Sequence, residues 1–242
     1  MHKSLLCLVL FMGVTMLSGC GIIDSYFLSP PENTARELAE AGTDAMQEKN
    51  YGKAVEYFTM LKDRYPFSPY TTQAELALAD AYFHDEQYMA AEDSYKEFES
   101  LHPRHEAIPY VLFQIGRANY MQFKSIDRPQ TQVEEGLQYF LRLQETYPGT
   151  QYAEKAGEFV IKSRTRLAEH ELYVADFYWR RDSFGPAWNR YKYVAEEFPD
   201  LPEIQEYARR KGELAYLKLQ LDASREIRER DEGTWKKWFK WL

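Results

Sequence analysis

Few residues of this 242-residue chain have the types and spacing that catalysis or metal binding requires. His102 and His105 in the segment HPRH could bind a metal ion as a pair, but Pro103 lies between them and no third ligand is evident nearby. The sequence contains no glycine-rich phosphate loop and no nucleophile elbow. We therefore predict that the protein is not an enzyme and holds no metal ion.

The composition limits the possible partners. Asp and Glu total 38 and Lys and Arg total 30, so the net charge is −8 and no basic field exists to bind a nucleic-acid backbone. The chain is 45% hydrophobic and 16% aromatic, which is enough to build the buried core of one large domain or two small ones. We expect a folded protein that does not bind nucleic acid.

The N-terminus has the pattern of an export signal. Lys3 precedes an apolar run from Leu5 to Leu17, which is shorter than the roughly 20 residues of a membrane-spanning helix. The LSGC that ends at Cys20 resembles the lipobox of bacterial lipoproteins, in which the chain is cleaved before the cysteine and the cysteine carries a lipid. An ordinary secretory signal with a chance cysteine is the alternative.

The lipobox resemblance implies a signal peptide over residues 1–19 and a lipidated tether over residues 20–33. Cys7 lies in the signal, so Cys20 would be the single cysteine after cleavage and no disulfide could form within the chain. In other bacterial lipoproteins, a residue such as Gly21 in place of Asp suggests sorting to the outer membrane. We predict a lipid-anchored protein on the periplasmic face of the outer membrane, with no cofactor besides the lipid.

Four prolines recur within a common pattern, which indicates an internal repeat. Twelve, eight and five residues before each proline stand a small, an aromatic and an apolar residue, and this spacing places them on one face of a helix. These sets are Ala54, Phe58, Leu61 and Pro66; Ala91, Tyr95, Phe98 and Pro103; Gly136, Phe140, Leu143 and Pro148; and Ala187, Tyr191, Val194 and Pro199. Each proline would end a helix.

The pattern resembles the tetratricopeptide repeat, an antiparallel pair of helices whose second helix carries Ala, Phe and a terminal Pro. The resemblance implies an all-α fold over residues 34–232, a superhelix of about five helix pairs. We place a loop insertion at Lys124–Thr131 and one long helix over Tyr152–Trp179, where no proline or turn signal occurs. This helix would join an N-terminal lobe over residues 34–149 to a C-terminal lobe over residues 150–232.

In such a superhelix, the first helix of each pair lines a concave surface on which a peptide can bind. We predict a groove for unfolded substrate peptides, lined by aromatic side chains and one arginine. These residues are Phe67, Tyr70, Phe83, Arg117 and Tyr120. The alternative is that these side chains only pack between neighbouring helices.

The last ten residues, 233–242, form a tail rich in Trp and Lys. Trp235, Trp238 and Trp241 alternate with lysines, a composition typical of segments that lie in a membrane interface. We expect these tryptophans to contact the membrane or a partner protein in preference to the last repeat.

The lipobox and several further segments together resemble the BamD family, the lipoproteins of the β-barrel assembly machinery. These segments include RYPFSPY at residues 64–70, HPRHEAIPYVLFQIGRANY at 102–120 and the stretch from YPGTQYAEKA at 147–156 to EEFPD at 196–200. The resemblance implies a scaffold that binds the POTRA region of BamA and companion lipoproteins, and that assists unfolded outer-membrane proteins. It places the BamA contact at Trp188, Asn189 and Arg190.

Two other classes of lipoprotein or periplasmic protein remain as alternatives. One is a periplasmic coordinator of the Tol-Pal or peptidoglycan type, which also carries breaks of the form YPxSxY. The other is a pilotin-like lipoprotein of secretin assembly.

Overall fold

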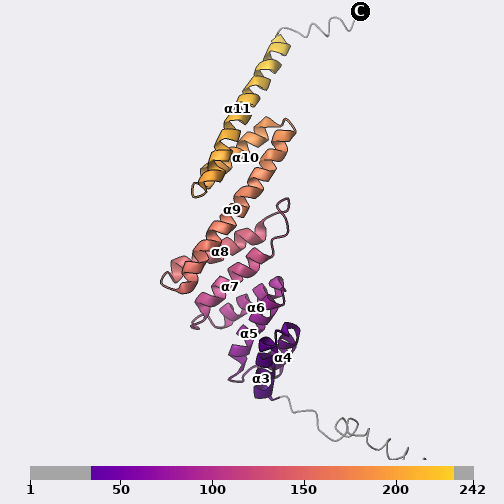
Figure 1. Ribbon diagram of the computed structural model, residues 1–242, viewed down its shortest axis with the longest axis vertical. Coiled ribbons are helices and arrows are strands. Elements are labelled where there is room, and N and C mark those ends of the chain that lie inside the picture. Colours follow the sequence, from indigo (N-terminus) through magenta and orange to yellow (C-terminus); the bar gives the residue numbers. More distant parts are fainter. Residues whose placement is uncertain (1–33, 232–242) are drawn as a thin grey trace, which may run out of the picture. The chain divides into compact units, whose positions relative to one another are not determined.

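The computed structural model describes residues 34–231, which contain nine α-helices and no β-strand (Figure 1). The helices are α3 (Ala35–Gln47), α4 (Tyr51–Arg64), α5 (Thr71–His84), α6 (Tyr88–Leu101), α7 (Ile108–Met121), α8 (Thr131–Thr146), α9 (Gln151–Arg180), α10 (Phe184–Glu197) and α11 (Pro202–Asp231). This all-α fold of tetratricopeptide-repeat type confirms the prediction from the sequence. α11 follows four helix–turn–helix segments and occupies the place of the first helix of a fifth pair.

The recurring prolines end helices in one common geometry. The residue before each proline caps the helix with φ between −118° and −132° and ψ between 53° and 57°. Its N–H donates to the carbonyl of the apolar residue four positions earlier, which is part of the repeat. These capping residues are Tyr65, His102, Tyr147 and Phe198. Because proline disfavours the α conformation in the residue before it and has no N–H of its own, the helix stops there.

Three of the turns inside helix pairs share a second geometry. Lys49, Glu86 and Asp182 have positive φ values of 58°, 59° and 55° in the turns after α3, α5 and α9. A residue other than glycine seldom adopts this left-handed conformation, so the sequence carries no signal for it. The connection from α7 to α8 is instead the longer loop expected from the sequence, and His170 of α9 contacts its Ile126 carbonyl at 2.6 Å.

Contacts divide the described residues into two compact units, 34–81 and 82–231, with the division inside α5. In the first unit, α3 packs against α4 so closely that a Cβ atom on Gly42 would lie 2.5 Å from the Phe58 ring. Leu38 and Leu61 complete this small core and are almost fully buried. The division into lobes near residue 149 stays a prediction.

In the second unit, each helix from α6 onward packs against the next helix. Gly116 of α7 lies against Phe140 of α8, as Gly42 lies against Phe58, and a Cβ atom there would lie 2.6 Å from the ring. The single long helix α9, predicted from the sequence, contacts both α7 and α8 and both α10 and α11. Alanines at its buried positions, Ala156 and Ala168 among them, allow these helices to approach.

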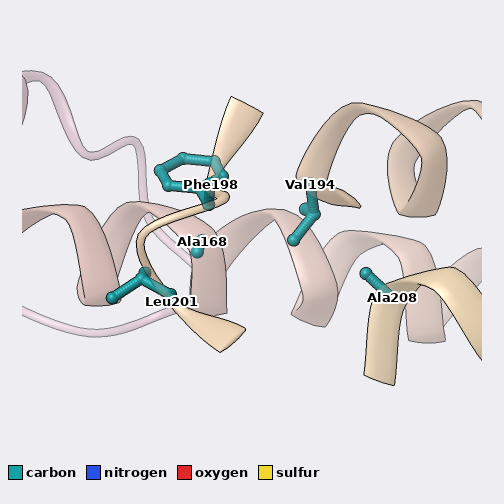
Figure 2. Close-up of a cluster of buried hydrophobic side chains, with 5 residues drawn as sticks. All are labelled: Ala168, Val194, Phe198, Leu201 and Ala208. Carbon is teal, nitrogen blue, oxygen red and sulfur yellow. The ribbon is translucent and has the colours of Figure 1, made fainter. Parts of the chain in front are cut away.

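The turn between α10 and α11 closes over the middle of α9. Figure 2 shows Ala168 of α9 in a cluster with side chains from the other two helices and from the turn that joins them. These side chains are Val194, Phe198, Leu201 and Ala208. Arg164 of α9 covers this cluster, because its guanidinium lies 4.9 Å from the Phe198 ring and binds both carboxylate oxygens of Asp200.

Candidate functional site

Arg117 lies between two aromatic rings in the second unit. Its guanidinium carbon is 4.6 Å from the centre of the Phe83 ring and 5.8 Å from the centre of the Phe113 ring. Gln114, one turn earlier on α7, accepts a hydrogen bond of 2.8 Å from Arg117 and donates to the hydroxyl of Tyr110 at 3.0 Å. This amide fixes the direction of the guanidinium, so Arg117 is held over the rings.

The aromatic surface continues along α7 onto α9. The Tyr120 ring meets the Phe159 ring edge to face at 5.5 Å, and the Arg166 guanidinium carbon lies 4.1 Å from the centres of both the Tyr120 and Phe123 rings. Phe159 and Arg166 are seven residues apart and therefore share one face of α9. We define the aromatic–arginine cluster as Phe83, Phe113, Arg117, Tyr120, Phe123, Phe159 and Arg166.

The cluster unites three of the five residues predicted for the groove and adds four that the sequence reading missed. Phe83 is buried, so it supports the surface from below, whereas Arg117 and Tyr120 are half-buried and reach solvent. Two cations held over aromatic faces are suited to contact aromatic or apolar peptide side chains and carboxylates. The spacing of Phe159 and Arg166 places them on one face of the long helix, but only the packing of α9 on α7 brings that face to Tyr120.

Phe67 and Tyr70, the other two predicted groove residues, belong to the first unit. Phe67 is fully exposed in the break between α4 and α5, at 100% relative exposure. Tyr70 borders a shallow cavity of about 290 Å³ between α3 and α5, with Arg36 and Thr43 on its wall. Both are accessible for contact with another molecule.

Trp188, predicted as a partner contact, lies in an apolar groove between α10 and α11. Its ring lies 5.1 Å from the Tyr216 ring, and the Lys192 ammonium lies 5.8 Å above it. The groove has a volume of about 380 Å³ and a rim of charged side chains. The rim residues are Lys192, Glu196, Arg209 and Glu213. An aromatic centre with a charged rim is the usual anatomy of a protein-binding surface.

Arg190 lies on another face of α10 from Trp188. Its guanidinium forms an ion pair of 2.6 Å with Glu171 of α9, and two positions along a helix rotate a side chain by about 200°. Asn189 is exposed beside it. The three residues predicted as one contact therefore do not form one continuous surface, and the Trp188 groove and the Arg190–Glu171 pair are separate candidates.

The two histidines of HPRH pack instead against the core. The His102 and His105 rings lie 4.8 Å and 5.3 Å from the Phe98 ring, and Nδ1 of His105 accepts a hydrogen bond from the N–H of Ala107. Within residues 34–231, no group of three or more His, Cys, Asp or Glu side chains is placed to hold a metal ion.

Two of the predicted sites lie outside the described residues. Cys20 with its tether falls before residue 34, and Trp235, Trp238 and Trp241 fall after residue 231. Among the helices of the described part, none combines the length and hydrophobicity needed to cross a membrane.

Comparison with known proteins places the chain in one family. The sequence model of YfiO, described as an outer membrane lipoprotein, matches residues 31–230. The outer membrane protein assembly factor BamD of Vibrio cholerae is 29% identical over 226 residues, which cover 89% of each chain. The protein of the same name from Neisseria gonorrhoeae is 27% identical over 90% of this chain and 85% of its own.

Among solved structures, a tetratricopeptide repeat protein from Parabacteroides merdae matches 81% of this chain and 78% of its own, with 14% identity and a TM-score of 0.40. The family match covers most of the sequence and all but the last residue of the part that the structure describes. The chain therefore belongs to the YfiO family of outer membrane lipoproteins.

Proposed function

We propose that this protein is an outer membrane protein assembly factor. A lipid on Cys20 anchors it to the periplasmic face of the outer membrane, and it acts there as a scaffold for the insertion of β-barrel proteins. The proposal rests on the similarity to relatives named outer membrane protein assembly factor BamD. This similarity extends over most of this chain and most of each relative. The stacked helices, with exposed aromatic side chains on several faces, are consistent with a scaffold.

The Trp188 groove is the proposed contact with the POTRA region of BamA. A tryptophan at the centre of a groove contributes most when a partner covers it and charged rim residues exclude water. The groove rim carries charges of both signs, which would select the orientation of the partner. The Arg190–Glu171 pair is a second, weaker candidate, because binding there would compete with an ion pair inside the chain.

Capture of BamA from detergent-solubilised membranes tests the groove. Lys192→Glu reverses one rim charge at a side chain that is 53% exposed and only loosely paired with Glu196 at 3.8 Å, so stability should change by less than about 0.5 kcal/mol. We expect capture to fall several-fold. Lys155→Glu, at an exposed lysine in the first turns of α9, is the matched control and should capture BamA normally. Equal capture by wild type and Lys192→Glu would exclude the groove.

The aromatic–arginine cluster is the proposed contact for unfolded β-barrel substrates. Arg166→Gln removes the cation from above Tyr120 and Phe123 and leaves a shorter, uncharged polar side chain. We expect it to weaken the capture of a urea-denatured barrel protein on dilution. Arg180→Gln, at an exposed arginine of the same helix, should have no effect. Equal losses in both variants would indicate a general charge effect and exclude a specific role of the cluster.

A further inference from the structure

A carboxylate on the long helix α9 joins the two helices that form the Trp188 groove. Asp176 accepts a hydrogen bond from the hydroxyl of Tyr191 on α10. It also accepts from the hydroxyl of Tyr207 on α11, which lies 3.1 Å from each carboxylate oxygen. Tyr191 is fully buried, and the two phenol rings meet edge to face at 6.4 Å. We call Asp176, Tyr191 and Tyr207 the tyrosine–aspartate network.

Both phenols act as hydrogen-bond donors in this network. Burial raises the pKa of Tyr191 and of Tyr207 above the ordinary tyrosine value of about 10, and the interaction with Asp176 raises both further. The hydroxyls therefore stay protonated at neutral pH. A carboxylate suits this position because both of its oxygens accept hydrogen bonds, whereas a carboxamide has one accepting oxygen.

The tyrosine–aspartate network borders the floor of the Trp188 groove. Ala208 and Gly212 line this floor on α11. A Cβ atom on Gly212 would lie 3.3 Å from the Cβ atom of Tyr191, and Tyr207 directly precedes Ala208. Trp188 and Tyr207 both pack against the buried cluster that contains Tyr191. Because the floor residues are too small to interlock, the hydrogen bonds to the two phenols are placed to fix α10 relative to α11.

A second anchor holds the same two helices at the turn between them. There, Val194, Phe198 and Leu201 pack in the cluster around α9. Tyr191 precedes Phe198 by seven residues, about two helical turns, and lies three residues after Trp188. The network therefore acts on the part of the groove away from the turn, where Trp188 lies.

We propose that Asp176 is a positioning residue for the Trp188 groove. Its carboxylate holds α10 and α11 at the spacing that presents Trp188 to a partner. Asp176 acts through Tyr191 and Tyr207, since it does not itself line the groove. The consequence for BamA binding rests on the proposed function, whereas the consequence for the shape of the groove does not.

Fluorine NMR tests the shape of the groove without any partner. The chain from residue 20 onward, produced without a lipid, is labelled with 5-fluorotryptophan, and Trp188→Phe identifies the Trp188 signal. We expect Asp176→Asn to shift this signal, because one accepting oxygen is lost. Tyr207→Phe keeps the ring and removes one hydroxyl, so it should shift the signal by less. Tyr207→Phe also serves as the test if Asp176→Asn does not fold.

Gly116→Ala is the control for a general loss of stability. Its added methyl group clashes with Phe140 in the packing of α7 against α8, which does not involve the groove. The Trp188 signal of this variant should stay at the position of the parent. A merely structural role of Asp176 would lower the melting temperature and leave the Trp188 signal in place.

Capture of BamA measures the consequence for binding. Asp176→Asn should weaken capture by about threefold to tenfold, the range expected for residues coupled in one hydrogen-bond network. The same substitution should have little further effect in a Trp188→Ala chain, because the groove has then lost its central ring. Gly116→Ala should capture BamA as the parent does.

The fluorine signal decides the proposal. An unchanged Trp188 signal in both Asp176→Asn and Tyr207→Phe would overturn the positioning role, and so would an equal shift in Gly116→Ala. A shifted signal with capture at the level of the parent would uphold the positioning role and contradict the proposed BamA contact at the groove.

Discussion

Replacement of Gly116 by alanine tests the close approach of α7 and α8 that shapes the aromatic–arginine cluster. The added methyl group would lie 2.6 Å from the nearest ring carbon of Phe140, so the ring must retreat by roughly 0.8 Å to reach the 3.4 Å of ordinary contact. Phe140 is fully buried and stacks on Phe159 at 5.1 Å, so it has no free space behind it. The helices must therefore separate or Phe159 must shift.

Two opposing effects set the magnitude of the change. Alanine favours a helix over glycine by about 1 kcal/mol, whereas an extra methyl group in a well-packed core costs about 1–3 kcal/mol. We expect Gly116→Ala to lower the free energy of unfolding by about 1–2 kcal/mol, which corresponds to a decrease in Tm of roughly 2–8 °C for a domain of this size. Gly52→Ala is the control, because a Cβ atom at Gly52 would meet no atom within 4 Å.

Thermal and urea denaturation followed by circular dichroism measure the difference between the two variants. Gly52→Ala should be neutral or slightly stabilising, and Gly116→Ala should be destabilised relative to it. Phe140→Leu should lower the free energy of unfolding less in the Gly116→Ala chain than in the parent, because leucine relieves the clash between the new methyl group and the Phe140 ring. A Tm of Gly116→Ala equal to or higher than that of Gly52→Ala would contradict the close packing of α7 against α8.

Four further outcomes are expected. Arg164→Ala should lower the free energy of unfolding by about 1 kcal/mol at pH 7, after allowance for solvent screening of its partly exposed pair with Asp200. The hydrogen bond from Arg164 lowers the pKa of Asp200, so the stabilisation is fully present above the ordinary aspartate pKa of about 4. As the pH falls below that value, the difference in the free energy of unfolding between Arg164→Ala and the parent should shrink. Cys20→Ser should release an otherwise folded chain from the membrane fraction of cells, and full retention would contradict a lipid anchor. Arg190→Glu should weaken BamA capture with little change in Tm if the Arg190–Glu171 face takes part, and unchanged capture would remove that face from consideration. Deletion of residues 235–242 should leave helical content and Tm nearly unchanged while it lowers vesicle or BamA binding, and a large loss of stability would show that the tail belongs to the core.

The repeat pattern predicted the helix ends because the physical cause is local. A proline acts on the residue directly before it, and the same capping geometry recurs at all four sites from Tyr65 to Phe198. The aromatic positions were also predicted, and in the structure Phe58 and Phe140 occupy them and pack against Gly42 and Gly116 of the preceding helices. The long helix α9 followed from the lack of any proline or turn signal within it.

The sequence could not predict which surface residues meet each other across helices. Phe159 and Arg166 join the aromatic–arginine cluster because α9 packs on α7, and this depends on tertiary packing that helix periodicity does not specify. Trp188 and Arg190 are neighbours in the sequence, yet the helical rotation between them separates their surfaces. The positive φ at Lys49 and Asp182 had no glycine to mark it.

Depletion of the protein in cells tests its proposed role in outer-membrane assembly most directly. The measurement is the folded fraction of an outer-membrane β-barrel protein, read from its heat-dependent mobility in SDS gels as the chain disappears. The proposed function predicts that unfolded barrel protein accumulates in step with depletion and that a plasmid copy of the parent chain restores folding. A folded fraction that stays constant while the chain is no longer detectable would contradict it.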